Sequence, residues 1–477
     1  MKKLSILQMN DTHGYLEAHQ ELLWSEKGET FKFMGGYARI ASIFEKTRRE
    51  NAAVLCLDSG DTIHGTYPAV QTKGEAFVEP LNTLQIDAMT AHWEFAYGPA
   101  HFQELAKKLN YPVLANNCYS KQSGELVFKP WQVFEKDDVK IGVIGIAATI
   151  IDKTMPKHFS EGIRFTNGTD ELKGNIEELK KKGVDLVVLL SHLGFPQDVS
   201  IAEQFDGNDV IVSGHTHDRL QVPRFANDTI IIQSGCHGSF IGKLDLEIEN
   251  KEIKGWHHDF IHVDDRWSEN EEMHQMVQEI MKPFRAELDK VVGKTSIPLH
   301  RNTILSAPMD DFLLAAITDC AKTEIGFSNG WRYGAPIPPG DITMNDLWNI
   351  IPTNPPVSTV DMTGAEIVQM IEENLERTFS ADPFGHMGGY VKRCTGLKLY
   401  IKVENPKGMR VQEVFTGNGP LKRDDRYKVA FVTEQGVPVK YGINRTDLGI
   451  HAVDAMKIYL QEHEVSAALS KSTVLAI

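Results

Sequence analysis

Seven aspartate and histidine residues in the first half of the chain have the side chains that bind divalent metal ions. They are Asp11, His13, Asp61, His92, His192, His215 and His217. Mixed carboxylate and imidazole ligands suit borderline ions such as Mn²⁺, Zn²⁺, Fe²⁺, Co²⁺ and Ni²⁺, and this set exceeds what one tetrahedral ion uses. The sequence therefore predicts two ions that share a bridging carboxylate. Such a pair generates a hydroxide nucleophile and neutralises a developing oxyanion, which is the chemistry of ester or anhydride hydrolysis.

These residues fall in five segments, most of them just after short apolar runs that predict buried strands. The runs cover residues 4–9, 54–57, 184–190 and 210–213. In parallel sheets, ligands bind beyond the carboxyl ends of the strands, so the five segments can meet at one edge. A single Asp-x-His is as often a capped turn, but the joint occurrence of all five segments favours a metal site.

The surrounding pattern predicts an α/β (α+β) fold with two domains, because a chain of 477 residues exceeds one ordinary core. Up to residue 262, apolar runs alternate with amphipathic helices such as residues 36–49 and 170–182. Residues 263–292 are charged and helical in period, with Pro283 as a possible kink, and predict a linker helix. A second domain follows at 293–477, with predicted helices at 309–320 and 364–375 and strands at 397–403 and 427–432.

Composition excludes some partners. The net charge of −15 argues against nucleic acid polymers but allows a small anionic substrate beside bound cations. The five cysteines are scattered and predict reduced thiols. No secretion signal and no membrane-spanning run is recognisable, so the sequence predicts a cytoplasmic enzyme that does not enter the bilayer. The oligomeric state is not determined.

The motifs resemble those of the calcineurin-like metallophosphoesterases, and within them the two-domain 5'-nucleotidases. The matching blocks are Asn-Asp-Thr-His-Gly at 10–14, Ser-Gly-Asp at 59–61, Ser-His-Leu-Gly at 191–194 and Gly-His-Thr-His-Asp at 214–218. The resemblance implies a four-layer β-sandwich flanked by helices, then a smaller α/β substrate-binding domain. It also implies that one ion takes Asp11, His13, Asp61 and His217, while the other shares Asp61 and takes His92, His192 and His215.

The third block departs from the family. Residues 91–98 read Ala-His-Trp-Glu-Phe-Ala-Tyr-Gly, where the family has Gly-Asn-His-Glu-Phe-Asp-x-Gly. His92 replaces an amide ligand, Trp93 replaces the histidine that assists catalysis, and Ala96 replaces the aspartate that orients it. Because a general acid contributes ~10²-fold to 10⁴-fold, an ordinary nucleotidase would be slowed. The block resembles that of the manganese thiosulfohydrolases, whose sulfur leaving group needs little protonation.

Further residues are candidates for catalysis and substrate binding. His64 and His237 are candidates to replace the lost acid, the alternative being solvated loop histidines, and Cys236 is expected to be a buried, inert thiol. In the second domain, Arg332 is a candidate to bind a phosphate or sulfonate, and Tyr390 to stack on a base. The family's second stacking aromatic is absent near residues 432–436.

These observations leave three functions open. The first is a dinuclear hydrolase of nucleotides or related phosphate esters, with manganese favoured over zinc, iron, cobalt or nickel and a metal-bound hydroxide as nucleophile. The second is cleavage of a sulfur–sulfonate bond at the same site. The third is a metal- or nucleotide-binding protein without catalysis.

Overall fold

A computed structural model describes residues 1–470 and 472–477 of the chain. The described chain divides into two compact units, one formed by residues 1–21 and 32–283, the other by residues 22–31 and 284–477. Where the sequence predicts a linker helix over residues 263–292, the structure has α8 (Glu271–Leu288), which contains Pro283, and the division falls directly after this proline. No helix of the described residues is long and apolar enough to cross a bilayer.

Two sheets pack face to face in the first unit. The five-stranded sheet has the order β15 (Glu252–His262), β14 (Phe240–Glu249), β1 (Lys2–Met9), β4 (Val54–Asp58) and β5 (Ala88–Met89). The six-stranded sheet has the order β12 (Arg224–Ala226), β13 (Thr229–Ile232), β11 (Val210–Val212), β10 (Leu186–Ser191), β8 (Val139–Ile146) and β7 (Trp131–Lys136). Apolar side chains from both sheets form one buried cluster, which is the core of a β-sandwich.

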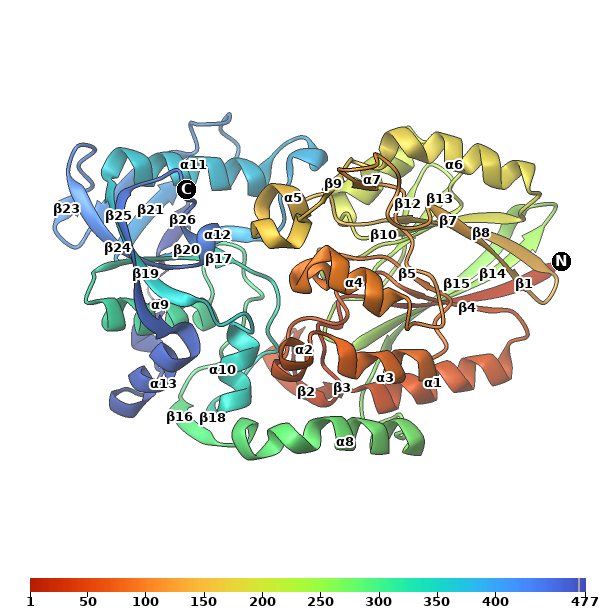
Figure 1. Cartoon of the computed structure of the whole chain (residues 1–477), viewed down its shortest axis with the longest axis horizontal. Helices are drawn as coiled ribbons and strands as arrows, with labels where there is room; N and C mark the ends of the chain where they lie inside the picture. Colours follow the sequence, from red (N-terminus) through yellow and green to blue (C-terminus); the bar gives the residue numbers. More distant parts are fainter. Residues whose placement is uncertain (471) are drawn as a thin grey trace. The chain divides into compact units, whose positions relative to one another are not determined.

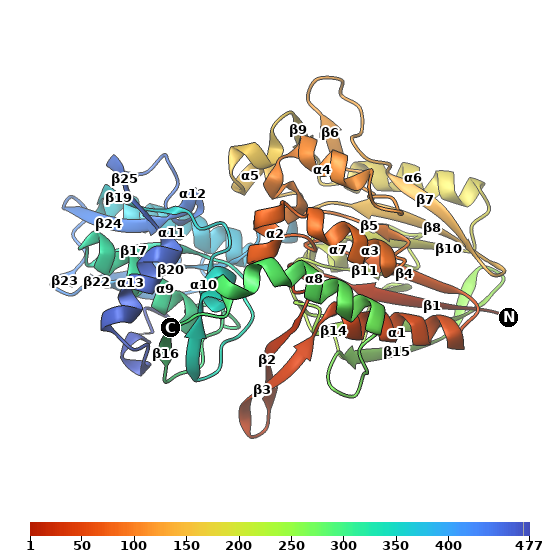
Figure 2. The same cartoon turned by 60° about the horizontal axis from the view of Figure 1, so that its bottom comes forward.

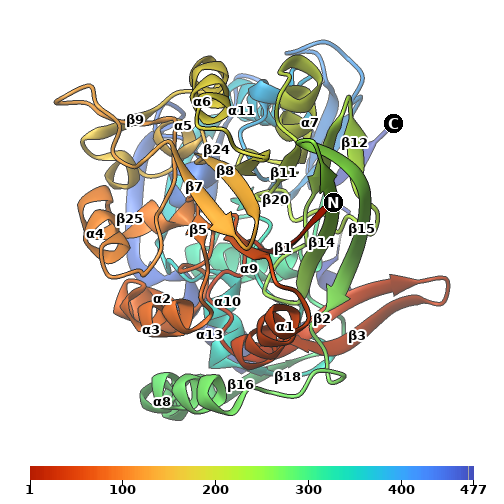
Figure 3. The ribbon, with the colours of Figure 1, turned by 90° about the vertical axis from the view of Figure 1, so that its right-hand side faces the viewer.

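Helices cover the outer faces of this sandwich. In Figures 1 and 3, α1 (Tyr37–Glu50) lies along the five-stranded sheet and α6 (Thr169–Lys181) along the six-stranded sheet. Each helix buries one stripe with helical spacing, such as Leu172, Ile176 and Leu179 in α6. The predicted four-layer α/β architecture is confirmed.

Shorter elements complete the first unit. They are α2 (Tyr67–Thr72), α3 (Val78–Thr83), α4 (Pro99–Ala106), β6 (Cys118–Ser120), α5 (Ile151–Thr154), β9 (Ile163–Phe165) and α7 (Phe195–Gln204). The strands β2 (Ala18–Ser25) and β3 (Gly28–Gly35) are divided between the units, because residues 22–31 belong to the second. The strands β2 and β3 pair with each other. Figure 2 shows the paired strands β6 and β9 near α4 and α5.

Parallel pairing aligns the strand ends that precede the metal-binding candidates. β1 pairs in parallel with β4 and β4 with β5, while β8, β10, β11 and β13 form a parallel series in the other sheet. These central strands are almost wholly buried, as expected for parallel strands covered on both faces. Their carboxyl ends therefore present the loops that follow them at a shared edge of each sheet.

The second unit has two larger sheets and a two-stranded one among the described residues. One has the order β20 (Tyr390–Thr395), β17 (Ile325–Gly330), β24 (Arg426–Val432), β19 (Pro356–Thr363) and β25 (Ile443–His451). The other has the order β23 (Gly419–Pro420), β22 (Val411–Thr416), β21 (Leu397–Ile401) and β26 (Val474–Ala476), and β16 (Val291–Thr295) pairs with β18 (Gly340–Thr343). The helices are α9 (Pro308–Ala321), α10 (Met344–Ile350), α11 (Gly364–Phe379), α12 (Thr433–Gly436) and α13 (Ala452–Glu462). The predicted helices at 309–320 and 364–375 correspond to α9 and α11. A capping box between Thr363 and Glu366 starts α11, whose apolar face joins the unit's core.

Candidate metal centre

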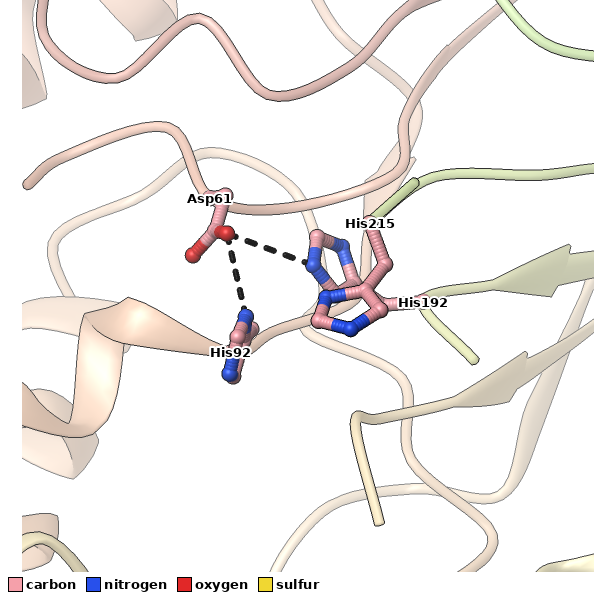
Figure 4. A group of neighbouring side chains, drawn as sticks. All are labelled: Asp61, His92, His192 and His215. Atoms are coloured by element: carbon pink, nitrogen blue, oxygen red, sulfur yellow. Dashed lines mark hydrogen bonds and ion pairs between the residues drawn. The ribbon is translucent and has the colours of Figure 1, made fainter. Parts of the chain in front are cut away.

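All seven predicted metal-binding residues lie in two neighbouring groups in the first unit. One group contains Asp61, His92, His192 and His215, and the other contains Asp11, His13 and His217. Within each group the potential ligand atoms lie within 4.8 Å of one another. Figure 4 shows the first group, with the three imidazoles gathered around the carboxylate of Asp61. The tertiary structure therefore brings together residues that are up to 206 positions apart, from Asp11 to His217.

Asp61 contacts members of both groups. Its Oδ2 lies 3.0 Å from His92 Nδ1 and 3.4 Å from His192 Nε2, and it is 4.0 Å from His13 Nε2 in the other group. Its Oδ1 accepts a hydrogen bond of 2.7 Å from the backbone N–H of Trp93. This position between the groups is the one that a bridging carboxylate requires.

The second group is built around Asp11. Its Oδ1 lies 3.2 Å from His217 Nε2, and His13 Nε2 lies 3.1 Å from the same His217 nitrogen. Two imidazole nitrogens bound to one ion at about 2.1 Å are separated by about 3.0 to 3.4 Å for bond angles between octahedral and tetrahedral values. The observed separation matches two ligands of a single ion.

Buried polar atoms without partners show that the residues fit metal ions. Asp11 Oδ1, His92 Nε2 and His192 Nε2 are buried and have no hydrogen-bond partner in the described chain. Buried polar atoms normally find partners, and an unpaired one costs about 1–3 kcal/mol. Nitrogen and oxygen atoms left unsatisfied in this way, within two groups of borderline ligands, fit divalent cations.

Electrostatics and backbone geometry support the same interpretation. Burial disfavours the charged form of Asp61, yet nearby His92 and His192 hold its pKa well below the ordinary value. Five of the seven residues have left-handed backbone conformations: Asp11, His13, Asp61, His215 and His217, with φ between 49° and 74°. Such conformations are uncommon outside glycine and cluster at functional sites, where the surrounding structure holds them.

Glu94 is a supporting residue that sequence reasoning missed. Its buried carboxylate accepts hydrogen bonds from the backbone N–H of His92 (2.6 Å) and of Thr62 (2.7 Å), and so ties together two ligand-bearing loops. Asn10 has a similar role, because its Nδ2 donates to Asp11 Oδ2 at 2.8 Å. Each of these polar residues lies within two positions of a ligand in sequence, a signal that could have identified them.

His64 and His237, the two candidates for the missing acid, are buried rather than solvated. His64 stacks on Trp93 with ring centroids 4.7 Å apart, and burial lowers its pKa to about 4, so this imidazole is neutral at pH 7. His237 lies 6.1 and 6.2 Å, ring to ring, from His13 and His217. The solvated-loop alternative is wrong for both, and a part in proton transfer stays a prediction.

Cys236 is buried, as expected, and its Sγ lies 3.5 Å from His237 Nδ1. Burial opposes ionisation of the thiol, but His237 and His217 lower its pKa to about 6. The thiol therefore has more polar surroundings than the sequence suggests.

Arg332 and Tyr390 lie side by side in the second unit. The guanidinium of Arg332 is 5.0 Å from the centre of the Tyr390 ring, and its Nη2 donates to the carbonyl of Gly389 at 3.1 Å. Where the family's second aromatic is absent, α12 instead carries Gln435, whose Oε1 accepts a hydrogen bond from Trp331 Nε1. These contacts hold a cation against an aromatic face, and the predicted binding of substrate by the pair stays a prediction.

A layered α/β sandwich with a two-group aspartate–histidine centre defines a metal-dependent hydrolase of the phosphoesterase class. Residues 4–219 match the family described as calcineurin-like phosphoesterase, and residues 286–433 match the 5'-nucleotidase C-terminal domain. The chain belongs to the two-domain 5'-nucleotidase family of calcineurin-like phosphoesterases.

Individual relatives agree with this assignment. A 5'-nucleotidase of Vibrio parahaemolyticus is 24% identical over 97% of this chain and 89% of its own length. Protein UshA of Escherichia coli is 25% identical over 77% of this chain and 76% of its own. The trifunctional nucleotide phosphoesterase protein YfkN of Bacillus subtilis is 23% identical over 90% of this chain, which spans only 31% of that longer protein.

Two solved structures share the fold. The sulfate thiohydrolase SoxB of Thermus thermophilus, solved with glycerol, has a TM-score of 0.92 at 23% identity, with 99% of this chain and 96% of that chain covered. A 5'-nucleotidase precursor, also from Thermus thermophilus, has a TM-score of 0.88 at the same 23% identity, with 100% and 99% covered. At this identity the two matches establish the fold, and they do not choose between the substrates that the two names imply.

Proposed function

We propose that this chain hydrolyses the phosphate ester of a nucleotide or a closely related small molecule at its two-group metal centre. The convergence of seven carboxylate and imidazole side chains in two neighbouring groups, with Asp61 between them, carries the proposal. The family assignment and the 5'-nucleotidases among the relatives support nucleotides as the substrate class. In the cell the reaction would contribute to nucleotide catabolism.

Different residues of the chain would have different roles in this reaction. Asp61 contacts both ligand groups and would bridge two ions, while Asp11, His13 and His217 would complete one site and His92, His192 and His215 the other. Two divalent ions at such a centre supply a hydroxide nucleophile at neutral pH and stabilise negative charge on the attacked group. Glu94 and Asn10 hold the ligand loops in place through backbone and side-chain hydrogen bonds. Arg332 and Tyr390 would bind the anionic and aromatic parts of the substrate.

The proposal also includes the identity of the metal ion and the cellular location of the protein. Manganese is the favoured ion, because the ligands are mixed nitrogen and oxygen donors without thiolate, although zinc, iron, cobalt and nickel accept the same set. A cytoplasmic location, predicted from the sequence, would be checked by fractionating cells that express the native gene.

A substrate panel tests the function. Purified protein loaded with Mn²⁺ would be assayed on 5'-AMP, a sugar nucleotide and S-sulfocysteine, and the series repeated with Zn²⁺ and Co²⁺. We expect release of phosphate from 5'-AMP, lost on Asp61→Asn and kept on Asp265→Asn, which changes an exposed aspartate of the same unit. Saturable nucleotide binding without turnover under every metal would contradict the proposal and favour a binding protein.

One observation favours a second candidate, hydrolysis of a sulfur–sulfonate bond. Trp93, which replaces the family's catalytic histidine, is only 7% exposed and packs against His64 and Phe159, so an indole occupies this position. An indole cannot donate a proton as an acid to an alkoxide leaving group, whereas a thiolate departs without one. Release of sulfate from S-sulfocysteine, without phosphate release from 5'-AMP, would establish this candidate over the first.

A further inference from the structure

A third cluster of ligand-type side chains lies beside the two-group centre. His19 and Glu21 occupy alternate positions of β2, so both side chains point to the same face of the strand. His237 comes from the loop after β13, and one ligand atom from each of the three residues lies within 4.8 Å of the others. We propose that His19, Glu21 and His237 bind a third divalent metal ion, of the Zn²⁺ or Mn²⁺ class, separate from the two-ion centre.

Hydrogen bonding prepares His19 to act as a ligand. Its Nδ1 lies 3.2 Å from the carbonyl oxygen of Glu17, which can only accept, so Nδ1 carries the proton. The lone pair then resides on Nε2, which faces the hydroxyl of Ser239 at 3.2 Å. Metal-binding histidines characteristically donate their other ring N–H to a carbonyl or carboxylate in this way.

His237 has the corresponding arrangement. Its Nδ1 lies 3.4 Å from Glu21 Oε2, and its Nε2 is buried with no hydrogen-bond partner among the residues that the structure describes. The side chain is only 3% exposed, so water does not readily satisfy this nitrogen. A cation in the cluster would take one ring nitrogen of His237 together with the carboxylate of Glu21.

The backbone is shaped to bring the three side chains together. His237 has φ of 60°, and its N–H donates to the carbonyl of Asp11 at 2.7 Å, which fixes the loop beside the Asp11 group. At Gly35, with φ of 82°, an added Cβ would approach His19 Cε1 to 2.9 Å and the His237 carbonyl to 3.3 Å. The absence of a side chain at Gly35 therefore leaves room for the His19 ring.

The cluster is distinct from the neighbouring metal group. The rings of His13 and His217 are 5.1 Å apart, whereas His237 lies 6.1 and 6.2 Å from them. The ligand atom of His237 meets those of His19 and Glu21 within 4.8 Å, whereas the neighbouring group consists of Asp11, His13 and His217. The ligands of the third site are two imidazoles and a carboxylate, a set used by zinc sites with an open fourth position.

The competing explanation is a hydrogen-bond network without an ion. Arg219 Nη2 lies 2.8 Å from Glu21 Oε1, and Glu21 in turn faces His237. This network accounts for Glu21 and His237, whereas His19 is held beside them by hydrogen bonds to the Glu17 carbonyl and the Ser239 hydroxyl, the second of which an ion on Nε2 would replace. The two explanations predict opposite effects of removing Arg219. Without an ion, its loss would weaken the hydrogen-bond network. With an ion, its loss would remove a positive charge that opposes binding of the cation.

Metal content distinguishes the two explanations. The full-length protein would be equilibrated with Zn²⁺, freed of unbound ion and measured by plasma mass spectrometry, with folding checked by circular dichroism. We expect about three ions per chain for the wild type, about two for His19→Gln, and about three for His257→Gln, a matched change at an exposed histidine. Arg219→Gln should keep the third ion and Asp61→Asn should lose ions only from the other centre.

Two results would overturn the proposal. One is saturation of the wild type at two ions, and the other is an unchanged ion count in folded His19→Gln. If His19→Gln does not fold, anomalous scattering at the zinc edge from wild-type crystals replaces it, and no peak between His19, Glu21 and His237 refutes the site. Turnover of 5'-AMP is recorded separately, so an inactive protein with three ions would contradict the proposed function alone.

Discussion

The Nε2 atoms of His13 and His217 face each other at 3.1 Å, with the carboxylate of Asp11 3.2 Å from the second of them. Two neutral imidazoles cannot both present lone pairs to each other at this distance without repulsion, so a shared cation or proton stabilises the arrangement. The same side chains come from loops that follow β1 and β11, in different sheets of the sandwich. An ion bound here therefore connects the two sheets.

Chelation should consequently lower stability as well as activity. Because metal ions bind the folded state, a concentration 100-fold above Kd adds about 2.7 kcal/mol per site. Treatment with EDTA should abolish hydrolysis and lower the thermal midpoint by several degrees, and Mn²⁺ should restore both. The midpoint is measured by scanning calorimetry, and an unchanged midpoint in fully metal-free protein would show that the groups do not hold ions.

Replacing Glu94 should weaken metal binding although Glu94 is not among the ligands. The two carboxylate oxygens of Glu94 accept hydrogen bonds from the N–H groups of Thr62 and His92. Glu94→Gln replaces one of these oxygens with an amide NH₂ group, which can only donate. Changes to residues that orient ligands typically cost 10-fold to 100-fold in metal affinity, and we expect a loss of that size in a Mn²⁺ titration. The matched control is Glu79→Gln, in α3. Equal affinities in the two variants would contradict the positioning role.

Restoring the family's third block should speed phosphate release. Trp93→His together with Ala96→Asp introduces an imidazole and a carboxylate to orient it, and a general acid contributes ~10²-fold to 10⁴-fold with poor leaving groups. We expect kcat for 5'-AMP to rise by at least ~10-fold. This expectation lies below the full range because the change also removes the indole that stacks on His64. The single change Ala96→Asp is the control and should give no gain. A double variant that folds without any gain would mean that another group already supplies the proton.

Asp198 should make stability depend on pH. Burial raises the pKa of Asp198 to about 7. The hydrogen bond of 2.6 Å that Ser191 donates to Oδ1 acts in the opposite direction and limits this rise. An acid with a raised folded-state pKa keeps its proton after the unfolded chain has released it, so its contribution is complete below about pH 4 and is lost as the pH rises to about 7. Between pH 5 and pH 8, Asp198→Asn should therefore gain stability relative to the wild type.

The size of this effect has an upper limit. A shift of about three units corresponds to at most about 4 kcal/mol, reached at high pH. Urea denaturation at both pH values, in the same metal state, measures it, with the exposed Asp206→Asn as the control. A stability difference between Asp198→Asn and the wild type that does not change with pH would show that Asp198 is charged in the folded protein.

The sequence by itself determined the chemistry and the local elements. Runs such as Leu4 to Met9 are largely apolar because parallel strands are buried on both faces, and they appear as β1 and its neighbours. The ligand types Asp11, His13 and Asp61 were recognisable because each follows such a strand. The substitution of Trp93 was equally visible, since it depends only on residue identity.

Only the tertiary structure decided which residues meet. The partnership of His19 and Glu21 with His237, about 216 positions away, depends on β2 lying beside the loop after β13. No local periodicity encodes that contact, because it results from the packing of whole sheets. The same holds for Glu94, whose two hydrogen bonds connect loops that the fold brings together. The sequence specifies which side chains are present, whereas the packing of the folded core sets the distances between them.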